Sequence, residues 1–287
     1  MTGENTTTSS RGKKKKDEFT DLGSAMQARL FVTDEICAKH GVKLVSAFDK
    51  PGVCLECAYE QKQRFEEDLN YKASMSYYKK STYNWLGERS IYLDESLSAA
   101  TFNSYQTEDK ETTKNKEKAF EIAREYCRGA TFNTILTGNA GTGKSHLAKA
   151  ILETVNENSE PYRRCLFVSV DEIMRRIKDS FNNKQSFYTE QFVVNLLTEA
   201  DLLVLDDIGA ETGAIGTNSS ASDFTTKTLY AIINGRMNKP TIITTNLNAK
   251  GLRNLYDSKL ISRMFKGAEG HVIAFKETND KRRTIDF

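Results

Sequence analysis

Short apolar runs alternate with longer segments of helical periodicity in the second half of the chain. The apolar runs lie at residues 134–137, 165–170, 202–205, 241–245 and 271–275. Runs of this length without polar alternation are typical of parallel strands that helices cover on both faces. The pattern therefore predicts an α/β domain built on a parallel sheet.

The first part of the chain has weaker patterning. Residues 1–20 contain almost no apolar side chains and a run of four lysines at 13–16, so we expect a disordered basic tail. Residues 21–94 combine four potential metal ligands with a charged, aromatic stretch of helix-like spacing, which predicts a small separate module. We place the domain boundary near residue 95, so that residues 95–287 form the α/β domain.

The composition is that of a soluble protein with balanced charge. The 41 basic and 39 acidic residues leave a net charge of +2, so any contact with nucleic acid must come from local patches. The chain has no run of the roughly 18 apolar residues that a membrane span needs, and its amino terminus lacks the apolar segment of a secretory signal. The sequence therefore predicts a cytoplasmic protein that does not act at a membrane.

A glycine-rich loop lies between the apolar run 134–137 and a helical segment that begins at residue 144. Its residues form a complete phosphate-binding pattern: Gly138, Asn139, Ala140, Gly141, Thr142, Gly143, Lys144 and Ser145. Glycines let backbone N–H groups converge on phosphate oxygens at a helix N-terminus. We expect Lys144 to reach the β- and γ-phosphates of ATP and Ser145 to bind Mg²⁺, with His146 completing the nucleotide-binding set.

Two acids and an amide follow the next strands of the predicted sheet. Asp206 and Asp207 come directly after residues 202–205, and Asn246 follows residues 241–245. The carboxyl ends of parallel strands meet at one edge of a sheet, where ligands bind. We assign Asp206 to Mg²⁺, Asp207 to the water that attacks the γ-phosphate, and Asn246 to that water or to the γ-phosphate. The alternatives are a helix cap for either acid and a simple turn for the amide.

Four further segments accompany the loop, at residues 99–105, 206–211, 244–246 and 260–264. With the loop they resemble the AAA+ ATPases, and closely the DnaC/DnaI-type replicative helicase loaders, with the IstB transposition helpers as near relatives. The resemblance covers about residues 95–287. It implies that Asn246 is a sensor-1 residue, that Arg263 is an arginine finger for the ATP site of a neighbouring subunit, and that Arg282 is a sensor-2 residue. A surface arginine remains the alternative for Arg263, and a solvated or DNA-binding basic cluster for Arg282.

The sequence departs from the common AAA+ pattern in two places. Only twelve residues follow the apolar run 271–275, so we expect the helical lid of many AAA+ proteins to be essentially missing. The metal strand ends in Asp206-Asp207, where the common pattern is Asp-Glu, so the shorter side chain predicts slow hydrolysis. Both departures fit a loader better than a mechanical unfoldase.

Four side chains near the amino terminus have the spacing of a metal site. Cys37 and His40 form one pair, and Cys54 and Cys57 form a second pair thirteen residues later. Two such pairs are typical of a closed, structural Zn²⁺ site; the alternative is buried thiols and a surface histidine. The module resembles the amino-terminal zinc modules of DnaI-type loaders, which implies docking to a helicase.

The leading hypothesis is an ATP-dependent loader of a replicative DNA helicase onto single-stranded DNA. We expect ATP, Mg²⁺ and Zn²⁺ as cofactors, and a homo-oligomer that forms with ATP and DNA. The basic tail, the tyrosine- and lysine-rich stretch 71–80 and the AAA+ domain all remain candidates for the DNA contact. The alternatives are a transposition-helper ATPase on duplex DNA and a small-molecule kinase, which would need an acceptor-binding lid.

Overall fold

The computed structural model describes residues 30–47, 50–210 and 222–281. The chain divides into two compact units, Met1–Met75 and Ser76–Phe287. This division precedes the boundary expected near residue 95, because Trp85, Leu86 and Ile91 are buried in the core of the second unit. The predicted tail and Arg282 lie outside the described residues. None of the helices in the described part of the chain combines the length and the hydropathy that a membrane span requires.

The first unit contains a two-stranded antiparallel hairpin, β1 (Leu30–Ile36) and β2 (Lys43–Ala47). Val45 of β2 also pairs with Val53, just before helix α2 (Leu55–Ser81) begins. The long apolar side chains of β1 are exposed, and no residue of α2 is buried. Among the described residues of this unit, Cys54 is the one buried hydrophobic residue, so the hairpin has almost no apolar core to stabilise it.

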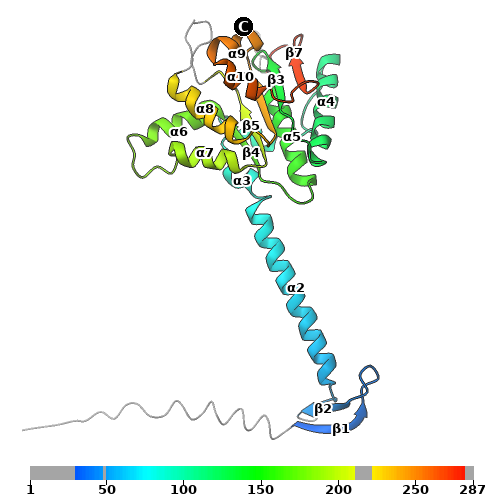
Figure 1. Ribbon diagram of the computed structural model, residues 1–287. Helices are drawn as coiled ribbons and strands as arrows, with labels where there is room; N and C mark the ends of the chain where they lie inside the picture. The colour runs from blue at the N-terminus through cyan, green and yellow to red at the C-terminus, as the bar shows by residue number, and fades with distance from the viewer. Residues whose placement is uncertain (1–29, 48–49, 211–221, 282–287) are drawn as a thin grey trace, which may run out of the picture. The chain divides into compact units, whose positions relative to one another are not determined.

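The second unit is built on a five-stranded parallel sheet, as predicted (Figure 1). The strand order is β4-β5-β6-β3-β7, in which every neighbouring pair is parallel. The strands are β3 (Thr134–Gly138), β4 (Cys165–Ser169), β5 (Leu202–Asp206), β6 (Thr241–Thr245) and β7 (Val272–Phe275). The strand that precedes the glycine-rich loop, β3, therefore lies between the strand that precedes Asn246 and the strand β7.

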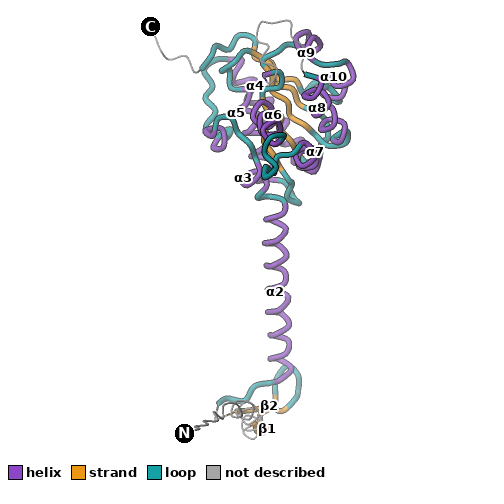
Figure 2. The backbone as a smooth tube through the Cα atoms, turned by 90° about the vertical axis from the view of Figure 1, so that its left-hand side faces the viewer, coloured by secondary structure: helices purple, strands orange, loops and turns teal. Residues whose placement is uncertain are grey.

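Helices cover both faces of this sheet (Figure 2). Alternate residues of a strand enter separate cores: Leu203 and Leu205 pack with helices α6 to α10, while Leu202 and Val204 pack with α4 and α5. The helices are α3 (Trp85–Arg89), η1 (Glu95–Ala99), α4 (Lys110–Cys127), α5 (Lys144–Asn158), α6 (Val170–Ser180), α7 (Glu190–Glu199), α8 (Asp223–Gly235), α9 (Ala249–Leu255) and α10 (Ser258–Met264). Residues 276–281, the described part of the chain after β7, contain no helix.

Candidate functional site

The glycine-rich loop connects the end of β3 to the N-terminus of α5. Gly141 and Gly143 have φ angles of 75° and 94°, in the region that other residues rarely adopt. A Cβ atom at Gly143 would lie 2.8 Å from the Tyr105 ring, so the loop also lacks space for a side chain there. The loop ends at the N-terminus of a 15-residue helix. The partial positive charge of that N-terminus favours the binding of phosphate.

Lys144 connects the loop to two of the three other predicted catalytic side chains, Asn246 and Asp207. Its ammonium group, on a buried side chain, donates to the Asn139 carbonyl oxygen at 2.6 Å and to Asn246 Oδ1 at 2.8 Å. The amide nitrogen of Asn246 in turn donates to Asp207 Oδ1 at 2.6 Å. The structure therefore brings Lys144, Asn246 and Asp207 into one network at the carboxyl edge of the sheet.

Asp206 lies beside this network in a buried position. Burial raises the pKa of Asp206, while hydrogen bonds from Thr244 and Ser145 act in the opposite direction. Thr244 Oγ1 donates to Asp206 Oδ1 at 2.7 Å. A hydroxyl and a carboxylate are the oxygen ligands that Mg²⁺ accepts alongside its waters, and a cation would offset the cost of burying the charge. Ser145 and Asp206 therefore fit the predicted Mg²⁺ site.

Thr244 is a site residue for which the sequence analysis predicted no role of its own. Besides its bond to Asp206, its Oγ1 accepts the backbone N–H of Asp207 at 2.8 Å. Asp207 has φ 59° and is the one non-glycine residue with positive φ in the described chain, a conformation that aspartate tolerates better than most residues. One buried hydroxyl thus fixes the side chain of one acid and the backbone of the next.

We expect Thr244→Val to reduce ATP hydrolysis by about tenfold or more and to leave nucleotide affinity within about threefold. Valine keeps the shape but removes both hydrogen bonds, so the Asp207 carboxylate loses its fixed direction. Phosphate-release rates and binding isotherms separate the two effects. Thr245→Val is the matched control, because Thr245 is equally buried but bonds to the backbone of Ile208 and Leu247. Equal losses in both variants would contradict a specific role for Thr244.

Two other predicted nucleotide-site residues make contacts elsewhere. His146 Nε2 lies 3.0 Å from both Ser104 Oγ and the Thr101 carbonyl oxygen, so this side chain contacts the segment that precedes α4. Arg263 lies over the Tyr230 ring at 4.7 Å and donates from Nε to Asn234 Oδ1 at 3.1 Å. A second hydrogen bond of the Arg263 guanidinium goes to the Lys259 carbonyl oxygen at 3.1 Å.

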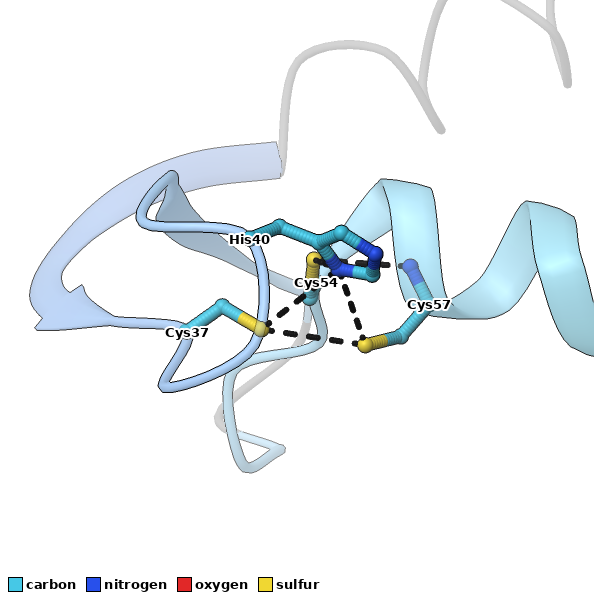
Figure 3. A group of neighbouring side chains, drawn as sticks. All are labelled: Cys37, His40, Cys54 and Cys57. Carbon is cyan, nitrogen blue, oxygen red and sulfur yellow. Dashed lines mark hydrogen bonds between the residues drawn. The ribbon is translucent and has the colours of Figure 1, made fainter.

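The four predicted metal ligands converge in the first unit (Figure 3). The sulfurs of Cys37 and Cys57 lie 3.7 Å apart. His40 Nδ1 lies 3.8 Å, 3.5 Å and 3.3 Å from the sulfurs of Cys37, Cys54 and Cys57. With metal–sulfur bonds of about 2.3 Å and a metal–nitrogen bond of about 2.0 Å, a tetrahedron requires about 3.8 Å between sulfurs and about 3.5 Å between sulfur and nitrogen. The cluster therefore fits a tetrahedral ion such as Zn²⁺.

Glu60 is a second residue that the sequence analysis missed. Its Oε1 lies 3.0 Å from Nε2 of His40, which favours the tautomer whose Nδ1 lone pair faces the sulfurs. Lys39 forms an ion pair with the same carboxylate. The backbone N–H groups of His40 and Lys39 also lower the pKa of Cys37 to about 6, which favours the thiolate that a metal binds. Glu60 lies one helical turn after Cys57, and this spacing of an acidic residue from a metal ligand is the feature of the sequence that could have indicated its role.

Comparison with known proteins supports the AAA+ assignment. Residues 99–270 match the family described as the bacterial DnaA ATPase domain. The replicative helicase loader DnaC of Escherichia coli (strain K12) is 29% identical over 188 residues, which cover 65% of this chain and 69% of DnaC. DnaC of Buchnera aphidicola subsp. Baizongia pistaciae is 28% identical over 186 residues, which cover 63% and 67%.

A crystal structure of the DnaC helicase loader, 22% identical, covers 64% of this chain and 100% of that chain with a TM-score of 0.44. The matched range, residues 99–270, contains the phosphate loop, Asp206 at the end of β5, Asp207 and Asn246. Because the matched family covers more than half of the chain, this protein belongs to the family of the bacterial DnaA ATPase domain, within the AAA+ ATPases.

Proposed function

We propose that this protein uses ATP to load a replicative DNA helicase onto single-stranded DNA. The observation that carries the proposal is the network of Lys144, Asn246 and Asp207 beside Asp206, in a chain similar to proteins named replicative helicase loader. ATP bound with Mg²⁺ would supply a phosphoryl group for hydrolysis. Lys144 would bind the phosphates, and Asp207 would accept a proton from the attacking water while Asn246 orients it.

The ATP site would act as a switch for assembly. Arg263, on α10, would contact the γ-phosphate held by a neighbouring subunit and stabilise the charge that develops during transfer. In the single chain its guanidinium is paired with Asn234 and Tyr230, so these contacts would be exchanged when subunits associate. A site shared in this way makes nucleotide affinity and subunit association depend on each other.

The first unit is proposed to dock the helicase. The hairpin and the start of α2 expose large apolar side chains, namely Leu30, Phe31, Val32, Ile36, Val53 and Leu55. Exposed apolar side chains in this number on a small unit are typical of protein interfaces. A Zn²⁺ ion held by the Cys37 cluster would keep this surface rigid, which lowers the entropic cost of binding.

The contact with single-stranded DNA is proposed to lie on the connection between α6 and α7. Phe181 and Phe187 there have exposed fractions of 60% and 83%, and Lys178 and Lys184 are exposed nearby in the sequence. Exposed rings stack with unpaired bases, and lysines attract the backbone. In the tyrosine- and lysine-rich stretch 71–80, the Tyr78 hydroxyl donates to the Tyr162 carbonyl oxygen.

Two single substitutions should separate these activities. We expect Phe187→Ala to weaken binding to single-stranded DNA by about tenfold and to leave helicase binding unchanged. Phe31→Ala should do the reverse, by a similar factor, because it removes an aromatic anchor from the proposed docking surface. Pull-downs with the host replicative helicase and fluorescence anisotropy with labelled oligonucleotides measure the two affinities.

The same assays test the proposed function as a whole. Absence of helicase binding in every nucleotide state would refute the loader proposal. A preference for duplex over single-stranded DNA, with filaments that form under ATP, would favour the transposition-helper alternative. Phosphate transfer to a metabolite without stimulation by DNA would favour a kinase.

A further inference from the structure

Glu111, in the first turn of α4, holds the chain segment that follows β7. Its Oε1 accepts the backbone N–H of Lys276 at 2.8 Å. Its Oε2 accepts the N–H of Glu277 at 3.0 Å, the N–H of Thr278 at 2.8 Å and the hydroxyl of Thr278 at 2.5 Å. Successive backbone N–H groups around one carboxylate form an anion-binding nest. Burial by itself would raise the pKa of Glu111. The four hydrogen bonds have the larger combined effect, so the pKa of Glu111 lies below its usual value.

The same segment, residues 276–281, reaches the phosphate loop three residues further on. The backbone N–H of Lys281 donates to the Gly141 carbonyl oxygen at 3.1 Å. The Asp280 carboxylate lies directly against Gly141, since a Cβ atom there would be 1.7 Å from Asp280 Oδ1. The Lys281 ammonium lies 4.6 Å from the centroid of the Tyr105 ring, and that ring lies against the loop at Gly143.

The bond from Lys281 to Gly141 has a directional consequence for the loop. In a trans peptide the C=O of one residue and the N–H of the next point in opposite directions. When Lys281 holds the Gly141 carbonyl, the N–H of Thr142 therefore points to the other side of the peptide plane, away from the segment. Because this peptide is already oriented before a nucleotide binds, the loop loses less conformational entropy when it binds a phosphate.

We propose that Glu111 is a positioning residue for nucleotide binding, because it anchors the segment that fixes the peptide of Gly141 in the phosphate loop. Glu111 acts through residues 276–281 and does not itself touch the nucleotide. The inference goes beyond the proposed loader function but rests on its nucleotide-binding part.

The direction of the change in nucleotide affinity distinguishes a positioning role of Glu111 from a purely electrostatic effect of its charge. Removing a negative charge near an anion-binding loop would by itself strengthen the binding of ATP and ADP. Loss of the anchor would weaken it, since the segment and the loop would have to be ordered when the nucleotide binds.

The test measures dissociation constants for ATP and ADP by calorimetry on the full chain. Glu111→Gln replaces one oxygen by an NH₂ group that faces N–H donors, and we expect about tenfold weaker binding. Thr278→Val removes one of the four bonds and should weaken binding about twofold to threefold. Glu117→Gln is the matched control, since Glu117 is exposed on the same helix and the change of charge is identical. It should bind as the unaltered chain does.

Thermal unfolding with and without nucleotide distinguishes positioning from a general loss of stability. Positioning predicts that Glu111→Gln reduces the increase in melting temperature that nucleotide produces. An unchanged increase, or an unchanged dissociation constant, would overturn the role of Glu111 and leave the proposed function intact. Failure of the unaltered chain to bind nucleotide would instead overturn the proposed function, and this inference with it.

Discussion

Lys144→Ala is expected to abolish nucleotide binding, with a loss of at least about a hundredfold in affinity. The Lys144 side chain is buried, and its ammonium group is the shared donor to Asn139 and Asn246. Truncation removes the one lysine of the loop and leaves the Asn246 carbonyl oxygen without this donor. A charge-assisted bond from a buried ammonium group to phosphate is worth more than a surface ion pair.

Calorimetric titration with ATP measures this loss directly. Lys227→Ala is the control, because Lys227 is exposed on α8 and its removal changes the net charge by the same amount. Circular dichroism should show the same helix content in both variants. Retention of micromolar ATP binding by Lys144→Ala would contradict the assignment of the loop as the phosphate site.

Removal of the metal is expected to unfold the first unit and to leave the second unit folded. The described part of the first unit buries almost no apolar surface, whereas structural Zn²⁺ sites in finger peptides contribute about 10–16 kcal/mol. The second unit has two large apolar cores of its own. We expect one zinc per chain by elemental analysis, and rapid proteolysis within the hairpin after chelation.

Single substitutions should reduce zinc binding to different extents. Cys54→Ser should lose the ion, since Cys54 supplies one of four ligands, and Glu60→Gln should weaken zinc binding by about tenfold to a hundredfold. Cys127→Ser is the control, because Cys127 lies on α4 in the second unit. A hairpin that resists proteolysis equally with and without chelator would count against a structural metal.

The fold could be predicted from the apolar strand runs. The proximity of the main site residues could be predicted from their positions at the ends of those runs. Parallel strands bring their carboxyl ends to one edge, so residues that follow different strands meet there without further information. Asp207 and Asn246 lie 39 residues apart, and Lys144 and Asn246 lie 102 apart, yet all three meet. The pairs Cys37/His40 and Cys54/Cys57 each have the three-residue spacing that lets two ligands bind one ion, so the cluster could be predicted as well.

The supporting residues could not be predicted, because their partners depend on register and packing. Thr244 has its role only because β5 and β6 pair in the register that places its hydroxyl between two acids. Glu111 meets backbone groups 165 to 167 residues away. The contact of Ile91 with the sheet edge also lacks a sequence signal: it is one bridge to Val168, and a single bridge has no periodicity.

The position of β7 in the sheet has a consequence for synthesis on the ribosome. The strand order places β7 next to β3, although 133 residues separate Gly138 from the start of β7 at Val272. Until residues 272–275 emerge, the nascent chain carries an open strand edge beside its glycine-rich loop, a feature prone to pairing with other chains. A chaperone that shields nascent β3 would therefore cover an edge that β4, β5 and β6 cannot close.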